Sequence, residues 1–240
     1  MALKAVFFDL VGTLVEPRGA IGVQYAAIAR RHGADVGAVA LEAAFAREMA
    51  STPAVQAWGL PRREAEAAER RWWSALVERV FHAAGAGALT RPGRFEPFFD
   101  DLYRHFTTAD AWQLFPDVVP AIDALRAEGL ITGLITNYDS RIYPLVESLG
   151  LASRLDSITI PATAGAMKPG RGIFMHALFA SRLAAAEAGH VGDSVADDYR
   201  GAVEAGLRGV LLDRDDEHAA LAGVARARSL DEAVALLGRR

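Results

Sequence analysis

The strongest constraint on the fold of this chain is a run of four apolar residues, Ala5-Val6-Phe7-Phe8, that leads directly into a carboxylate and a glycine turn. A continuous apolar run is typical of a parallel strand that is buried on both faces. Ligands bind at the carboxyl ends of the strands in open parallel sheets. Asp9, the first residue after this run, is therefore a candidate nucleophile, although an aspartate in this position also occurs as an ordinary turn or helix-capping residue.

Three further apolar segments are followed by polar residues of the kinds that bind phosphate groups or metal ions. In chain order, Ile131 to Ile135 ends in Thr136-Asn137, Ile158-Thr159-Ile160 precedes the pair Lys168-Pro169, and His190-Val191 ends in Gly192-Asp193-Ser194, with Asp197 and Asp198 just behind. The order of these polar groups, most of them at predicted strand ends, indicates a composite site rather than a set of unrelated turn residues.

This order of motifs resembles that of the haloacid dehalogenase-like (HAD) hydrolase superfamily. The motifs match in chain order: the nucleophile loop at Asp9 to Thr13, the Ser/Thr motif at Thr136, the lysine motif at Lys168, and the acidic motif at Gly192-Asp193 through Asp198. The match covers essentially the whole chain. Further similarities are typical of the subfamily of haloacid dehalogenase-like hydrolase domain-containing protein 3, and they lie at Tyr25 to Gly33, Trp72-Trp73, Trp112-Gln113 and Gly192 through Gly206.

The resemblance implies that Asp9 is the catalytic nucleophile of a hydrolase. The implied substrate is a small phosphorylated metabolite, which would react through an aspartyl-phosphate intermediate. An anionic nucleophile that approaches an anionic substrate needs charge neutralisation, which a hard divalent cation supplies. The resemblance therefore implies Mg²⁺ as the cofactor, with Asp9, the backbone carbonyl of Val11 and Asp193 as its protein ligands.

The other motif residues have implied roles around the phosphoryl group. Thr136 would donate its hydroxyl to a phosphoryl oxygen, with the neighbouring Asn137 amide helping. Lys168 would hold the phosphoryl oxygens and offset the carboxylates. It is one of only two lysines in the chain, and a compact ammonium suits a tight site beside carboxylates and phosphate. Asp198 or Asp197 would orient Lys168 or a water at the metal.

Two positions depart from the family pattern. Val11 stands where phosphatases of this superfamily usually place a second aspartate, which protonates the leaving group and later activates water. An isopropyl group does neither, and a general acid of this kind is worth roughly 100-fold to 10,000-fold in rate. Gly170-Arg171 stands where the lysine motif commonly has Asp-Pro. We therefore expect weak turnover of ordinary phosphomonoesters.

Two other functions remain open. A 2-haloacid dehalogenase uses the same aspartate nucleophile without a metal and needs no aspartate at position 11, but such enzymes usually have tyrosine there and need no metal-binding acid at the position of Asp193. A catalytically impaired module that binds a ligand or a protein would explain Val11. Such a module would not explain why five polar motif residues are all present, because buried like charges are costly without a compensating cation. These residues are Asp9, Thr136, Lys168, Asp193 and Asp198.

The apolar pattern predicts an α/β fold with a doubly wound three-layer α/β/α Rossmann-like core and a parallel sheet. From Leu14 to about Ala109 the apolar residues recur at intervals of three and four, which indicates helices rather than strands. We predict a core domain of residues 1–15 and 110–240 and an inserted helical cap of residues 16–109. The family resemblance implies a cap of the C1 type and the strand order 5-4-1-2-3, with Arg208 to Leu212 as the outer fifth strand.

The composition and charge of the chain limit the kinds of partner that the protein is expected to bind. A formal net charge of -4 gives no general basic field for nucleic acid. Asp9 interrupts the first apolar run before a signal-peptide core or a membrane span could be completed. The absence of cysteine excludes disulfides and thiolate metal sites. We expect a cytoplasmic enzyme that binds a small phosphorylated substrate, without a nucleic-acid or membrane partner.

Overall fold

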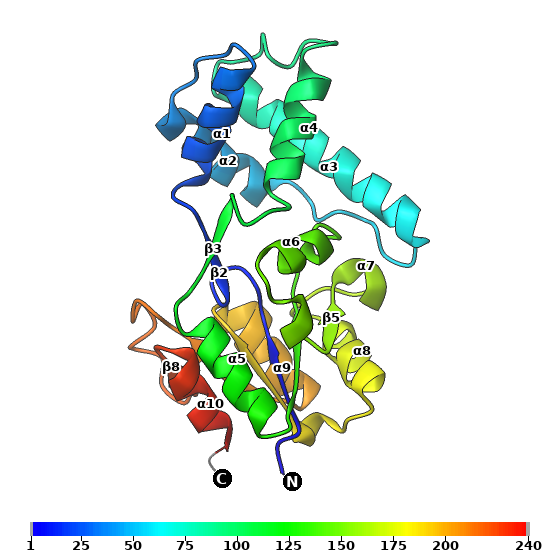
Figure 1. Ribbon diagram of the computed structural model, residues 1–240, viewed down its shortest axis with the longest axis vertical. Coiled ribbons are helices and arrows are strands. Elements are labelled where there is room, and N and C mark those ends of the chain that lie inside the picture. The colour runs from blue at the N-terminus through cyan, green and yellow to red at the C-terminus, as the bar shows by residue number, and fades with distance from the viewer. Residues whose placement is uncertain (1, 239–240) are drawn as a thin grey trace. The chain divides into compact units, whose positions relative to one another are not determined.

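The computed structural model describes residues 2–238, and its main element is a parallel β-sheet (Figure 1). In this sheet, β1 (Ala5–Phe8) pairs in parallel with β4 (Ile131–Ile135) on one side and with β6 (Ala188–Gly192) on the other. All four residues of β1 are fully buried. A strand between two neighbours that is covered on both faces has no side chain in water, which explains its uninterrupted apolar run.

Within residues 2–238, the strands of the main sheet lie in the order β5-β4-β1-β6-β7-β8, and each neighbouring pair is parallel. The remaining members are β5 (Ser157–Thr159), β7 (Arg208–Leu212) and β8 (Arg226–Ala227). The α/β class with a parallel Rossmann-like sheet is confirmed. The prediction that Arg208 to Leu212 forms the outer strand is wrong, because β8 pairs with β7 beyond it. A strand of two residues is too short to produce a readable alternation in the sequence.

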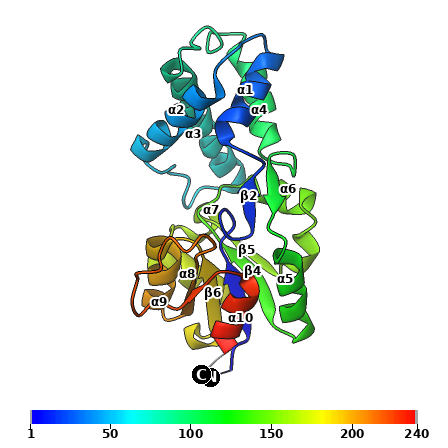
Figure 2. The same ribbon diagram turned by 90° about the vertical axis from the view of Figure 1, so that its left-hand side faces the viewer.

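Helices cover both faces of the sheet (Figure 2). On one face α8 (Arg171–Ser181) packs with α9 (Gly201–Ala205), and on the other α5 (Val118–Ala127) packs with α10 (Leu230–Gly238). Successive side chains of a strand point to opposite faces. Phe7 accordingly joins Phe174 and Leu178 of α8 in one buried apolar cluster. Burial of a side chain of this size stabilises the fold by about 1.5–3 kcal/mol, and it fixes the strand that carries Asp9.

Several of the remaining elements are short. A second, two-stranded sheet consists of β2 (Val15–Pro17) and β3 (Trp112–Leu114). The sequence pattern predicts helices rather than strands between Leu14 and about Ala109, so it is wrong for β2, whose three residues give too few alternations to detect. The other short elements are α7 (Pro161–Ala164), 3₁₀ turns at Ala152–Arg154 and Ala185–Glu187, and a π-helix at Val195–Arg200, labelled η3.

The chain divides into two compact units. The first, here called the sheet unit, comprises Met1–Glu16, Leu114–Asp139 and Gly150–Arg240. The second, here called the helical unit, comprises Pro17–Gln113 and Ser140–Leu149. Its helices are α1 (Ile21–Arg31), α2 (Ala38–Ser51), α3 (Arg62–Ala83), α4 (Phe95–His105) and α6 (Ile142–Ser148). The assignment of residues 16–109 to a cap domain and of 1–15 with 110–240 to a core domain stays a prediction.

The helical unit has an aromatic core of its own. The rings of Phe81 on α3 and Phe98 on α4 meet edge to face with their centroids 4.7 Å apart, and both side chains are fully buried. Such pairs contribute about 0.5–1.5 kcal/mol beyond the burial of their area.

No helix in residues 2–238 combines the length and the apolar composition needed to cross a bilayer.

Candidate active site

Asp9 and Lys168 form a buried ion pair at the carboxyl end of β1. The backbone N–H of Asp9 donates to the carbonyl of Val191 at 2.9 Å, which extends the pairing of β1 with β6 by one residue. Nζ of Lys168 donates to Oδ1 of Asp9 at 2.5 Å. Lys168 is 2% exposed and Asp9 is 8% exposed. The fold therefore brings together two predicted site residues that are far apart in the sequence.

Lys168 also binds a second carboxylate. Its Nζ lies 2.5 Å from Oδ1 of Asp198. Burial alone would lower the pKa of Lys168, but the negative charges of Asp9 and Asp198 outweigh burial and raise it above the ordinary value. The side chain is therefore a fixed ammonium that stays charged at neutral pH and joins the two carboxylates.

Asn137 holds the backbone of Lys168. Its Nδ2 donates to the Lys168 carbonyl at 3.0 Å, and its Oδ1 accepts the Lys168 N–H at 2.8 Å. Neighbouring Thr136 is 2% exposed, and its backbone N–H donates to the carbonyl of Thr159. Thr136 directly follows β4, the neighbour of β1, as the sequence predicts. The predicted roles of Thr136 and Asn137 at a phosphoryl group stay predictions, whereas the bracing of Lys168 by the Asn137 side chain was not anticipated.

Asp198 has three polar partners, Lys168, His190 and Ser194. Besides Lys168, its Oδ1 lies 2.9 Å from Nε2 of His190, and its Oδ2 accepts the N–H of Ser194 at 3.0 Å. Burial would raise the pKa of Asp198, but the hydrogen bond from His190 and the charge of Lys168 hold it well below the usual range. Asp197 is the other acid considered from the sequence. Its backbone N–H donates a hydrogen bond to Oγ of Ser194 at the start of η3.

His190 contacts Asp198 of the candidate site and was not predicted from the sequence. It is fully buried in β6, and its ring meets Phe174 edge to face at 5.4 Å. The contact with Asp198 assigns the Nε2–H tautomer, in which the ring donates to the carboxylate. The one available signal was a polar residue inside an otherwise apolar strand, directly before Val191, Gly192 and Asp193.

Three carboxylates converge where a cation could bind. Ligand oxygens of Asp9, Asp193 and Asp198 lie within 4.8 Å of one another. Oδ1 of Asp193, which is exposed, accepts a hydrogen bond from the Thr13 hydroxyl at 3.3 Å. Partial desolvation, and then the negative charges of Asp9 and Asp198, raise the pKa of Asp193 to about 6. A hard divalent cation would relieve this repulsion, and an all-oxygen donor set fits Mg²⁺.

The turn after β1 is shaped around Asp193. Gly12 has φ +84°, and a Cβ at this position would overlap the carboxylate of Asp193. Glycine is therefore required here both for the backbone conformation and for the close approach. Val11 lies in the same turn and forms an isolated bridge with Val15. The predicted role of the Val11 carbonyl as a metal ligand stays a prediction.

Comparisons with known proteins found a matching family and solved structures with the same fold. A family model described as haloacid dehalogenase-like hydrolase matches residues 3–206. The chain is 30% identical over 213 residues to "Haloacid dehalogenase-like hydrolase domain-containing protein 3" of Bos taurus, covering 88% of this chain and 82% of that protein. It is 34% identical over 181 residues to a phosphoserine phosphatase of Thermus thermophilus, covering 75% of this chain and 66% of that protein. The crystal structure of a defluorinating L-2-haloacid dehalogenase has the same fold, with a TM-score of 0.77, 22% identity and coverage of 98% of this chain and 95% of that one.

Proposed function

Since the chain belongs to the haloacid dehalogenase-like hydrolases, we propose that it is a magnesium-dependent phosphohydrolase acting on a small phosphorylated metabolite, with Asp9 as the nucleophile. The observation that carries this proposal is the convergence of the Asp9, Asp193 and Asp198 carboxylates beside the buried Lys168. Asp198 already pairs with Lys168, so the acid that a metal-free displacement by Asp9 leaves without a role is Asp193. A bound divalent cation would offset the negative charges of these acids and of a phosphoryl group, which is the charge neutralisation that an anionic nucleophile needs to approach an anionic substrate.

The reaction divides into two displacements at phosphorus. A carboxylate oxygen of Asp9 attacks the phosphoryl group, an O–P bond forms, and the P–O bond to the alcohol breaks. Water then attacks the same phosphorus, which releases inorganic phosphate and restores Asp9. Lys168 holds Asp9 in one orientation and places a fixed positive charge beside the developing negative charge. When bound, Mg²⁺ supplies a Lewis acid that offsets the charge on the phosphoryl oxygens.

Other residues of the sheet unit position the reactants. Thr136 offers a hydroxyl at the end of the strand next to β1, and Asn137 fixes the backbone that carries Lys168. Asp198 orients the lysine and balances its charge. Transfer of a phosphoryl group is catalysed mainly by such positioning and electrostatics. In this proposal only Asp9 forms a covalent bond to the substrate, and the other residues position the reacting groups.

The relatives support a phosphatase without excluding the second chemistry of the family. One relative is named as a phosphoserine phosphatase, whereas the fold is shared with a protein named as an L-2-haloacid dehalogenase. Both chemistries use an aspartate nucleophile, so the products must be measured. Release of inorganic phosphate from a panel of phosphorylated metabolites, with Mg²⁺ and with EDTA, should be compared with halide release from L-2-chloropropionate.

We expect phosphate release that requires Mg²⁺ and no halide release. Metal-independent release of chloride would overturn the proposal in favour of a dehalogenase. Saturable binding of a metabolite without any turnover, even after prolonged incubation at high enzyme concentration, would identify a binding module instead.

Replacement of Val11 by aspartate tests why turnover should be slow. Val11→Asp places a carboxylic acid beside the leaving group without altering the backbone carbonyl. The rate on an alkyl phosphate should rise by at least about tenfold, a modest part of what general acid catalysis supplies. An aryl phosphate should gain less, because its leaving group needs little protonation. If a folded, Mg²⁺-binding variant shows equal or lower rates on both substrates, Val11 is not simply a missing acid.

A further inference from the structure

Arg214 forms a hydrogen bond to the backbone of the turn that follows Asp9. This residue lies just after β7, and its Nη2 donates to the carbonyl of Thr13 at 2.9 Å. Thr13 is fully buried, and its hydroxyl is the group that donates to Asp193. A side chain from another part of the sheet unit therefore holds the backbone of a residue whose own side chain orients one of the clustered carboxylates.

Two neighbours, Asp117 and Phe115, hold Arg214 itself in place. Its two terminal nitrogens bind the two oxygens of Asp117 at 2.9 Å and 3.0 Å, which is a bidentate pair. Its guanidinium lies over the ring of Phe115, 4.0 Å from the centroid. Asp117 is fixed in turn by the N–H of Leu230, which donates to its Oδ2 at 2.9 Å. Such a guanidinium has little freedom to move, so it is suited to holding a backbone carbonyl in one position.

The same segment supports the turn a second time. The N–H of Phe115 donates to the carbonyl of Leu14, so two successive carbonyls of the turn are held, one directly and one through Arg214. Within the turn, the N–H groups of Leu14 and Val15 both donate to the carbonyl of Leu10, at 2.8 Å and 2.9 Å. This network encloses Val11 and Gly12, the residues between Leu10 and Thr13.

We propose that Arg214 is a positioning residue for the candidate metal site: it acts through Thr13 and fixes the turn from Leu10 to Val15, and it touches neither substrate nor metal. The proposal rests on the proposed function for the identity of the site, but the contacts that carry it are those of the protein alone. Loss of an outer partner of a metal ligand typically weakens metal binding by roughly 10-fold to 100-fold.

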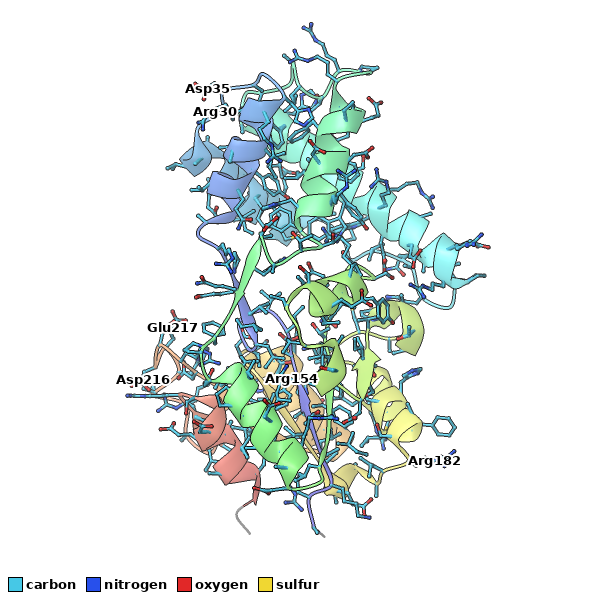
Figure 3. The ribbon with its side chains drawn as sticks, in the orientation of Figure 1. Arg30, Asp35, Arg154, Arg182, Asp216 and Glu217 are labelled. Carbon is cyan, nitrogen blue, oxygen red and sulfur yellow. The ribbon has the colours of Figure 1, made fainter. Side chains whose placement is uncertain are left out.

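The test compares Arg214→Met with a matched variant. Arg154, labelled in Figure 3, makes the same kind of grip elsewhere in the sheet unit: it binds both oxygens of Asp123 and the carbonyl of Gly150. Arg154→Met thus removes a similar set of hydrogen bonds, at a more exposed position, that is not connected to Thr13 by these bonds. Binding of Mg²⁺ is measured by titration calorimetry, and amide hydrogen exchange is measured on the metal-free proteins.

In Arg214→Met we expect Mg²⁺ affinity to fall by at least about tenfold, and the amides of Leu14 and Val15 to exchange faster. We expect neither change in Arg154→Met, and partial recovery of affinity in Arg214→Lys. Asp117→Asn keeps Arg214 but weakens the bidentate pair that holds it, so we expect an intermediate loss of Mg²⁺ affinity. This variant replaces Arg214→Met in the experiment if Arg214→Met does not fold. Unchanged exchange at Leu14 and Val15 in Arg214→Met or Asp117→Asn would overturn the inference. An absence of Mg²⁺ binding in the unmodified protein would instead count against the proposed function, and the exchange data would still decide whether Arg214 positions the turn.

Discussion

Replacement of Asp9 by asparagine is expected to lower phosphate release by at least about 1,000-fold, because an amide cannot supply the attacking oxygen. The change is nearly isosteric. Lys168 retains its contact with Asp198, so the buried ammonium keeps one carboxylate partner and the fold should persist. Initial rates of phosphate release, together with the circular dichroism spectrum and the melting temperature, measure both outcomes.

Asp123→Asn is the matched control for Asp9→Asn. It makes the same chemical change at a partly exposed aspartate that pairs with Arg154, and it should leave the rate unchanged. Because an asparagine can deamidate back to aspartate, the mass of the Asp9→Asn protein must be checked before and after the assay. Undiminished activity in a variant whose mass is correct would remove Asp9 from the mechanism.

Replacement of Asp193 by asparagine is expected to weaken Mg²⁺ binding by more than the roughly 10-fold to 100-fold that follows loss of an outer partner. An amide oxygen carries no net charge, so the cation would lose one of its anionic ligands. Calorimetric titration of the wild type and the variant with Mg²⁺ gives the affinities directly. Equal affinities would mean that Asp193 is not a ligand.

Asp193→Asn weakens Mg²⁺ binding, but it should stabilise the fold of the metal-free protein. The folded-state pKa of Asp193, about 6, exceeds its ordinary value of 3.8, so the folded state binds the proton more tightly than the unfolded chain does. Ionisation of Asp193 therefore opposes folding as the pH rises from about 4 to about 6, and the cost persists above pH 6. Metal-free Asp193→Asn should melt at or above the temperature of the wild type at pH 7, and the difference should vanish below pH 4. A lower melting temperature at pH 7 would contradict the repulsion inferred here.

Much of the sheet unit could be predicted because its physical causes are local. The uninterrupted apolar run of β1 reflects burial on both faces, and the polar residue after it lies at the carboxyl end of the sheet for the same topological reason. Lys168 could be selected because a compact ammonium suits a site beside carboxylates and phosphate, whereas residue type could not distinguish Asp198 from Asp197. The contacts of Lys168 with Asp198 and with Asp9 could only be seen in three dimensions.

The features that escaped prediction depend on short elements or on long-range contacts. β2 and β8 contain three and two residues, too few for a periodic signal. His190 resembles any buried strand residue until Asp198 is placed beside it. Arg214 is one of many arginines in the sequence, and its grip on Thr13 depends on a contact between residues at opposite ends of the chain.

The fate of solvent oxygen distinguishes a phosphatase from a dehalogenase, because the two chemistries break different bonds of the covalent intermediate. Water attacks an aspartyl-phosphate at phosphorus, whereas it attacks the ester left by displacement of a halide at the carboxyl carbon of the aspartate. The protein should be incubated in H₂¹⁸O with p-nitrophenyl phosphate and Mg²⁺ and, separately, with L-2-chloropropionate, followed by mass spectrometry of the phosphate and of the peptide that contains Asp9. We expect ¹⁸O in the released phosphate and none in the Asp9 carboxylate in either reaction. Incorporation of ¹⁸O into Asp9 during release of chloride would contradict the proposed function.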